Sequence, residues 1–382
     1  MTVDALRAAA RRHADTVISP NVRAWELAGT FPREAARAAA ADGLLGLFAP
    51  ADVGGQDRTF AEAMGVFEEL GRGDASYAFA LSMHNAVANA ISRFGSPPLR
   101  DRYARGLTSG ELLGCFSLTE PQAGSDAAAI TTRAVPDGDG WRVNGRKGWV
   151  SLIGEADVYL VACRTGSERG TSDVMLIAID AKATGVRVEK IYDKAASSFL
   201  PIGELALDDV SCPGDAVVAP AGLGMQAALG AIDVARCDIA AIAVGLAAAS
   251  LDVALAYARD RAAFGGTLLD LQALQFALAD VETEIVCGRL LYERAAASLT
   301  AGSGAVDAAH AKRFCPDIAL RAAITCSEVL GANGWLNDYP LARHLANAKM
   351  LQVVDGTTEI QRLVIARSLR TRAAGLPPAQ RS

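Results

Sequence analysis

The spacing of apolar and polar positions divides the chain into regions of different periodicity. Up to about residue 110, Ala, Leu and Glu recur at helical intervals in segments that end at Gly or Pro, as in residues 4–18, 60–73 and 77–95. The pattern predicts an N-terminal helical domain over residues 1–111.

From Leu112 the helical spacing gives way to short runs of Val, Ile and Thr separated by turn residues. Clear examples are residues 128–135, 141–150, 156–165 and 172–179. Strands at this spacing are typical of a small β-barrel or sandwich. We therefore expect a β-domain over residues 112–222.

Helical spacing returns after residue 222 in long Ala-rich segments that are apolar on almost every side. This pattern favours buried helices of a bundle over residues 223–372, followed by a frayed, Pro-containing tail at 373–382. The expected helices are 235–262, 268–299, 304–330, 338–351 and 357–371.

Composition narrows the possible functions. The chain is 51% hydrophobic and 21% charged with a net charge of -6, which excludes a disordered protein. No long run of like charge offers a surface for nucleic acid or an anionic membrane. The start carries Asp4 and other charges instead of an apolar leader, so we expect a cytoplasmic protein without a membrane segment.

The cysteines and histidines give no metal-binding pattern. The seven cysteines are scattered without a CxxC pair, which favours buried free thiols. The four histidines stand far from one another and share no metal-ligand spacing with each other or with a cysteine. We therefore predict no metal site.

A series of motifs along nearly the whole chain resembles the acyl-CoA dehydrogenase family. The resemblance implies a mostly α fold with a central β-domain, in which an N-terminal helical domain and a β-barrel domain precede a C-terminal four-helix bundle. The motifs include FSLTEPQAGSD, NGRKGWVS, ARDRAAFGGTLLDLQ, SEVLGANGW and QVVDGTTEIQRLVIAR.

The resemblance implies bound FAD. Phe116, Leu118 and Thr119 match positions that line the flavin ring, and Gly124 and Ser125 match positions near the pyrophosphate. A Gly-Ser turn can offer backbone N–H groups and a hydroxyl to phosphate, although the same residues also form ordinary turns.

Two residues at the end of NGRKGWVS also match the flavin site. Trp149 corresponds to an aromatic beside the flavin and Ser151 to a hydroxyl that donates near N5. The alternatives are a strand tryptophan in the core and a hydroxyl at a strand end.

Further matches imply that a neighbouring subunit completes the FAD site. The protein would then be at least a dimer, and a dimer of dimers is expected. An isolated Arg261 would otherwise be a solvated charge at a helix end. Glu328 and Glu359 stand where relatives usually have glutamines, so they must turn away from the pyrophosphate or be paired. The residues that match the neighbouring subunit's contribution are Arg261, Phe264 and Gln272, and the other residues that match positions near the cofactor are Glu328, Gly331, Thr357 and Glu359.

Asp355 stands where most of the family has its catalytic glutamate. The other position that carries the base in some relatives is Ala235 here, so no second carboxylate replaces it. We interpret Asp355 as the base that removes a proton from carbon, with a pKa raised by burial. Alternatively, Asp355 only caps the helix that begins near Thr357. Nitroalkane oxidases look like precedents for an aspartate in this role.

The residues expected near the thioester are Ser125, Asp233 and Arg236. Asp233 and Arg236 could instead be an i,i+3 pair on a helix surface. The segment AASSFLPIGEL lacks the Arg and Ser that commonly precede the following strand in relatives. This departure makes a carrier-protein-bound acyl group a plausible alternative to acyl-CoA.

The predicted function is FAD-dependent α,β-dehydrogenation of an acyl thioester, with an electron-transfer flavoprotein or a similar acceptor. Two alternatives keep the fold. One is a flavin oxidase or monooxygenase that resembles nitroalkane oxidase and uses the aspartate. The other is a non-catalytic flavin-binding or acyl-binding protein, because fold does not fix function.

Overall fold

The first region folds into six α-helices, four of which begin at a capping side chain. The computed structural model describes residues 1–166 and 170–375. Thr59 and Glu62 form a capping box at the start of α4, and the Asp74 carboxylate accepts from Ser76 N at 2.9 Å at the start of α5. The helices are α1 Val3–His13, α2 Val22–Ala28, α3 Arg33–Ala41, α4 Phe60–Gly73, α5 Ala75–Phe94 and α6 Pro97–Thr108.

The middle region forms an eight-stranded sheet, in the order β6-β7-β3-β2-β4-β5-β8 with β1 paired to β4. β2 and β4 share only the pair Arg133↔Arg164, so the sheet consists of two halves. Apolar residues of both halves belong to the main hydrophobic core. The strands are β1 Gly114–Ser117, β2 Arg133–Asp137, β3 Gly140–Ser151, β4 Val158–Arg164, β5 Val174–Asp180, β6 Val186–Ile191, β7 Ile202–Cys212 and β8 Val217–Ala219.

One predicted strand is shorter than expected. Residues 128–135 are typical of a strand, but β2 begins only at Arg133. The backbone N–H groups of Thr131 and Thr132 donate to the Glu120 carboxylate, at 2.6 and 2.9 Å, instead of to a neighbouring strand.

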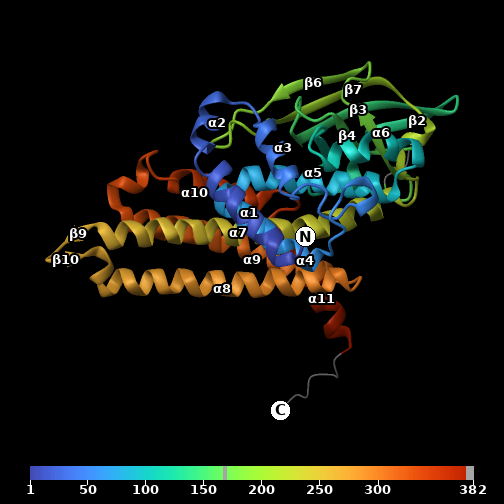
Figure 1. Ribbon diagram of the computed structural model, residues 1–382. Coiled ribbons are helices and arrows are strands. Elements are labelled where there is room, and N and C mark those ends of the chain that lie inside the picture. Colours follow the sequence, from blue (N-terminus) through green and yellow to red (C-terminus); the bar gives the residue numbers. More distant parts are fainter. Residues whose placement is uncertain (167–169, 376–382) are drawn as a thin grey trace, which may run out of the picture.

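Long helices make up the rest of the molecule. In Figure 1 the sheet covers one end of the bundle, and the β9–β10 hairpin projects from the opposite end. The first helix begins well before the predicted residue 235, and α10 begins after the predicted residue 338. The elements are α7 Gly224–Asp260, β9 Ala262–Ala263, β10 Gly266–Thr267, α8 Gln272–Thr300, α9 Ala305–Leu330, α10 Leu341–Val353 and α11 Thr358–Ala374.

α7 forms the centre of the bundle and packs closely against α4. A Cβ added at Gly245 would lie 2.0 Å from the Glu68 carbonyl oxygen, and one at Gly71 would lie 2.5 Å from the Ile242 carbonyl oxygen. Glycine at both positions is therefore required for this close helix contact. α7 is long and apolar enough to cross a membrane by composition, but most of its apolar stretch is buried in the molecule.

One cysteine differs from expectation in its burial. Cys287 is exposed on α8, whereas the other cysteines are buried free thiols, so the expectation of buried thiols was wrong for this one. Residues 376–382 of the predicted tail lie outside the described residues.

Candidate functional site

Asp355 lies in the short turn between α10 and α11. Its φ is +48° and that of Gly356 is +92°, so two consecutive residues adopt left-handed backbone. Asp tolerates this conformation better than most residues do. At Gly356 an added Cβ would also lie 2.9 Å from Gln361 Nε2 and 3.3 Å from Arg236 Nη2. The Asp-Gly pair is thus required by the shape of the turn.

The cap of α11 is provided by Thr357. Its hydroxyl accepts from Ile360 N at 3.4 Å. The alternative in which Asp355 is present only to cap this helix is therefore wrong.

Side chains from three helices hold the backbone of the turn in place. Lys312 Nζ on α9 donates to Gln352 O at 3.0 Å, and Arg236 Nε on α7 donates to Asp355 O at 3.3 Å. Gln361 Nε2 on α11 donates to Gly356 O at 2.8 Å. These hydrogen bonds hold the peptide groups of the turn in place, and none of them involves the Asp355 carboxyl group.

The Asp355 carboxyl group is enclosed and lacks full hydrogen bonding. Its Oδ2 has no hydrogen-bond partner among the described residues. Burial raises the pKa of Asp355 to about 6, although the positive charges of Lys312 and Arg236 act to lower it. The negative charge of Asp355 in turn raises the pKa values of Cys115 and Asp238, after the larger effect of burial on each.

Arg236 connects this turn to Asp233. Its Nη1 donates to Asp233 Oδ1 at 2.6 Å, so the two form the i,i+3 pair considered from the sequence. The pair is not a surface pair, however, because Arg236 is buried. Its guanidinium holds the Asp233 carboxylate and the turn at Asp355 together.

The predicted flavin-facing residues gather at the end of β1 and along β3. Gly148 N donates to Thr119 O at 2.9 Å, and the β3–β7 register shifts between Lys147 and Val150. At this irregularity Trp149 has φ +57° and is 64% exposed, with its ring 4.6 Å from that of Tyr192. The interpretation of Trp149 as a core tryptophan is wrong, since the irregular strand directs it outward.

Other predicted residues on these strands differ in exposure. Leu118 and Ser151 are buried, while Phe116 and Thr119 are half-buried.

A buried ion pair supports the loop that follows β1. Lys147 Nζ donates to Glu120 Oε1 at 2.8 Å and to Leu118 O at 2.9 Å. The loop presents Gly124 and Ser125 to solvent, and a Cβ at Gly124 would meet no atom within 4 Å. An exposed aromatic ring and an open Gly-Ser turn on one rigid support fit the flavin and pyrophosphate of FAD.

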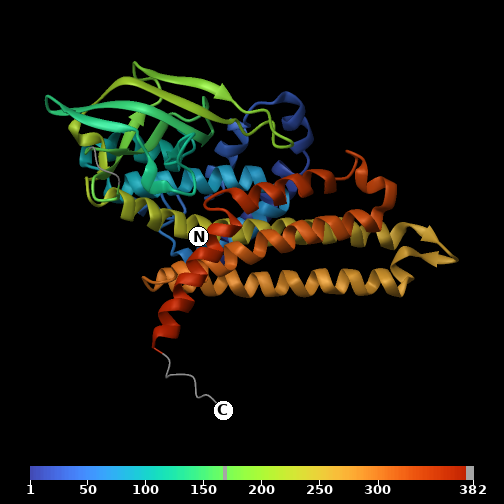
Figure 2. The same cartoon turned by 180° about the vertical axis from the view of Figure 1, so that it is seen from behind.

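The other residues predicted to bind FAD lie apart from those on the sheet and its loop. Arg261 ends α7, Phe264 is 92% exposed in the β9–β10 hairpin, and Gln272 begins α8. Figures 1 and 2 both place this hairpin at the opposite end of the molecule from the sheet. Glu328 and Gly331 lie exposed at the end of α9. Within one chain, the FAD-matching residues of the hairpin therefore do not meet those of the sheet.

Glu359 is exposed and pairs with Arg362 at 3.2 Å. The carboxylate that stands in place of the usual glutamine is thus paired.

Sequence reasoning missed four groups around Asp355: Ser82, Cys115, Asp238 and Lys312. Two of them carried a signal. Asp238 is a carboxylate followed by the long apolar run of α7, and Lys312 is a charged residue that is fully buried in an Ala-rich helix. Charged residues are almost never fully buried without a partner or a role.

Comparison with known proteins gives consistent matches over the three regions. Family models of the N-terminal, middle and C-terminal domains of acyl-CoA dehydrogenase match residues 2–111, 115–210 and 222–370. A probable acyl-CoA dehydrogenase of Mycobacterium leprae is 32% identical over 367 residues, which are 95% of this chain and 94% of the relative.

Solved structures agree. Butyryl-CoA dehydrogenase from Megasphaera elsdenii superposes with a TM-score of 0.92 at 30% identity, covering 96% of this chain and 98% of that one. Glutaryl-CoA dehydrogenase from Mycobacterium smegmatis, in complex with FADH2, superposes with a TM-score of 0.91 at 28% identity, covering 98% and 96%. The chain therefore belongs to the acyl-CoA dehydrogenase family of FAD-dependent oxidoreductases.

Proposed function

We propose that this protein oxidises an acyl thioester between its α and β carbons, with Asp355 as the base that removes the α proton. The observation that carries the proposal is the enclosed Asp355 carboxyl group, whose Oδ2 has no partner among the described residues although the turn around it is tightly held. The β hydrogen would leave as hydride to flavin N5 when FAD is bound.

The electrostatics of the site suit a base. With a pKa raised to about 6, Asp355 is ionised at neutral pH yet holds a proton more strongly than a free aspartate does. A base works best when its pKa lies near the working pH. Lys312 and Arg236 keep the carboxylate charged without taking its Oδ2 as a hydrogen-bond acceptor.

The N–H of Asp355 supplies the second element of the chemistry. Proton removal places negative charge on the thioester oxygen, and a fixed N–H aimed at that oxygen stabilises the charge. Arg236 anchors the carbonyl of the same residue, which supports a fixed orientation of the turn. Aspartate is one methylene shorter than glutamate, so the α carbon must lie closer to this turn than it does in relatives with glutamate.

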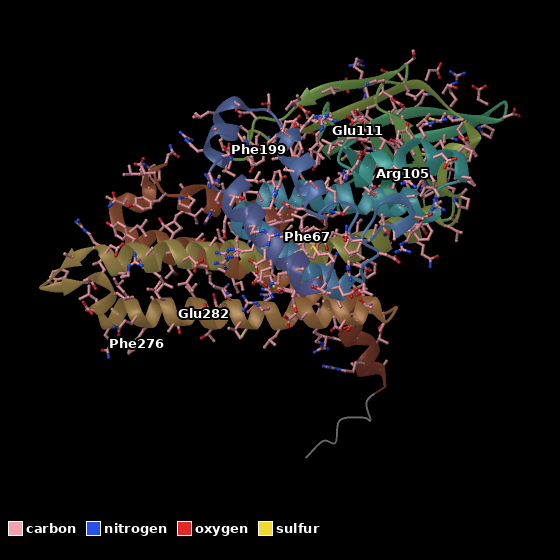
Figure 3. The ribbon with its side chains drawn as sticks, in the orientation of Figure 1. Phe67, Arg105, Glu111, Phe199, Phe276 and Glu282 are labelled. Carbon is pink, nitrogen blue, oxygen red and sulfur yellow. The ribbon has the colours of Figure 1, made fainter. Side chains whose placement is uncertain are left out.

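The FAD site is proposed to form between two subunits. Phe264 belongs to the β9–β10 hairpin and Trp149 to β3. The hairpin and the sheet lie at opposite ends of one chain, yet both groups match FAD positions. The outer face of α8 exposes Phe276, Val286 and Leu290, and Figure 3 shows Phe276 directed away from the bundle. An apolar face beside the hairpin supports association with a second copy.

Mixing two inactive variants tests the shared site. We expect Arg261→Ala and Asp355→Asn homo-oligomers to be inactive or weak, and co-expressed mixtures to regain activity, because some sites would combine two intact contributions. Mixtures that regain nothing above the sum of the parents would contradict a shared site.

The carrier and the acceptor follow from weaker observations. Glu26 accepts from Ser197 N at 2.7 Å and from Ser198 N at 3.0 Å, so the segment that departs from the family pattern is tied to α2. We propose that the acyl group is carried on the pantetheine arm of either CoA or a carrier protein. An electron-transfer flavoprotein is the proposed acceptor, and hydrogen peroxide formed at the rate of turnover would instead indicate an oxidase.

Exchange of the α hydrogen tests the role of Asp355 directly. The FAD-loaded protein in D2O should incorporate deuterium at the α carbon of a bound acyl thioester, as measured by mass spectrometry. Asp355→Asn should abolish this exchange while retaining FAD. Equal exchange in both proteins would overturn the assignment.

A further inference from the structure

A second buried carboxyl group lies beside the proposed base. Asp238 on α7 is 1% exposed, and Ser82 Oγ on α5 donates to its Oδ2 at 2.7 Å. Its Oδ1 has no hydrogen-bond partner among the described residues. The like charge of Asp355 acts on Asp238, so the two groups share one electrostatic environment.

Packing does not account for this carboxyl group. The residues that follow it on α7, from Ile239 to Leu246, are buried and apolar apart from Gly245. A hydrophobic residue of similar size would avoid the cost of burying a polar oxygen without a partner. Burial raises the pKa of Asp238 to about 8, so the group is neutral at neutral pH and carries a proton that it can donate.

The surroundings of Asp238 leave its free oxygen to a ligand. Across from it, Ser82 is flanked on α5 by Phe79 and Met83, which are both buried. The ionisable group that acts on the pKa of Asp238 is Asp355 from the turn, and Asp238 in turn acts to raise the pKa of its neighbour Cys237. No lysine or arginine forms an ion pair with Asp238 among the described residues. Asp238 and Ser82 are thus a polar pair among apolar side chains between α7 and α5, and such a pair can orient a ligand by hydrogen bonding.

We propose that Asp238 and Ser82 recognise a hydroxyl or amine carried by the acyl group of the substrate, so that this protein prefers heteroatom-bearing acyl thioesters to plain hydrocarbon ones. The inference rests on the proposed function, because Asp355 marks where the α carbon lies. The heteroatom lies beyond the β carbon, since the α and β carbons are the reacting positions.

A hydroxyl and an amine on the acyl group would interact with the Asp238 carboxyl group in different ways. A hydroxyl accepts the proton of the neutral carboxyl group in a hydrogen bond and leaves it on Asp238. An amine takes that proton, which gives an ammonium group paired with a carboxylate. In both cases Oδ1 gains the partner that it lacks.

Binding of unreactive substrate analogues tests the inference. Pantetheine thioethers replace the thioester, so they cannot be oxidised and need no CoA head group. Three chains of equal length end in methyl, hydroxyl or amine, and calorimetry measures their dissociation constants with the FAD-loaded protein. We expect the better polar chain to bind about tenfold more tightly than the methyl chain.

Variants assign the preference to Asp238. Asp238→Leu, of similar size, should remove or invert the preference, and Ser82→Ala should reduce it by less. Asp238→Asn keeps neutral hydrogen bonding, so it should retain a preference for hydroxyl and lose one for amine, which distinguishes the two groups. Asp252→Leu, an exposed carboxylate on the same helix that pairs with Arg72, is the matched control and should change nothing.

The ratio of the dissociation constants of the methyl chain and the polar chains should differ between the wild type and Asp238→Leu. An equal ratio in both proteins would overturn the inference, as would a wild type that prefers the methyl chain. Should Asp238→Leu fail to fold, Asp238→Asn and Ser82→Ala still carry the comparison. The proposed function fails separately: a binding preference without α-hydrogen exchange would contradict Asp355 as base and leave the recognition by Asp238 standing.

Discussion

Two buried carboxyl groups in this molecule, those of Glu120 and Asp355, each lie near a buried lysine, but their pKa values shift in opposite directions. In the sheet, Glu120 pairs with Lys147 at 2.8 Å. In the bundle, Asp355 interacts with the charge of Lys312, whose Nζ instead donates to the Gln352 carbonyl oxygen. Both lysines are fully buried.

Hydrogen bonds to the carboxylate account for the difference. Glu120 accepts from Thr131 N at 2.6 Å, Thr132 N at 2.9 Å and Gln122 Nε2 at 2.7 Å, in addition to Lys147. Burial alone would raise the pKa of Glu120, but Lys147 and these bonds lower it to about 2. Asp355 receives no such set of bonds, and burial raises its pKa to about 6.

A nearby cation therefore does not by itself decide the role of a buried carboxylate. Where donors fill its oxygens, the carboxylate holds a loop in place. Where an oxygen is left free, it can take a proton from a substrate.

Asp355→Asn should show the largest effect. A positioned general base typically contributes about 10²- to 10⁴-fold in rate. We expect the rate of flavin bleaching by an acyl thioester to fall by that range, measured anaerobically by rapid mixing, while the FAD content is unchanged. Loss of FAD would instead show that Asp355 is structural, as Glu120 is.

Lys147→Met should chiefly affect stability. Removing one partner of a buried ion pair leaves an uncompensated charge, which typically costs about 3–5 kcal/mol. Urea unfolding should reveal this loss. Lys182→Met, which changes an exposed lysine of the same region, is the control and should unfold like the wild type.

Lowering the pH should reduce the free energy of unfolding, because Glu120 becomes protonated. The pKa of Glu120 in the folded protein is about 2 against an ordinary 4.5, so its stabilisation is complete above pH 4.5 and is lost as the pH falls toward 2. This corresponds to about 3 kcal/mol. Glu120→Gln should flatten the dependence of unfolding free energy on pH over this window, and an unchanged slope would contradict the assignment.

The smallest expected effect is a shift in the pH profile of the reaction. Activity should rise with pH through about 6, as Asp355 loses its proton. The groups that interact with Asp355 are the cations of Lys312 and Arg236, and the neutral acids Asp238 and Cys115. Lys312→Gln removes a charge that lowers the pKa of Asp355, so the rise in kcat/KM should move to higher pH.

Arg321→Gln on the same helix, which removes an exposed charge paired with Glu284, should leave the profile in place. A profile that moves equally in both variants would indicate a general effect of charge instead of a local one.

Local pattern was sufficient for the presence of the long helices, because helical spacing involves residues that are adjacent in the chain. Gly124 and Ser125 were matched to the FAD site by resemblance, and the structure leaves both exposed. The contacts around Asp355 could not be predicted from local sequence pattern. Arg236 meets Asp355 across 119 residues, and nothing local to either residue indicates the contact.

The errors have physical reasons of the same kind. Asp238 follows Arg236 in the sequence and looks like another helix charge, until the fold buries it against α5. Cysteine is a residue type that is usually buried, but Cys287 lies on a surface that one chain leaves open.

An anaerobic titration of the FAD-loaded protein with acyl thioesters, on CoA and on a carrier protein, tests the central claim most directly. The account predicts that at least one thioester bleaches the visible flavin band with the wild type, and that the same thioester leaves the band of Asp355→Asn unchanged on the same timescale. Equal bleaching in both proteins, or none by any thioester with the wild type, would contradict it.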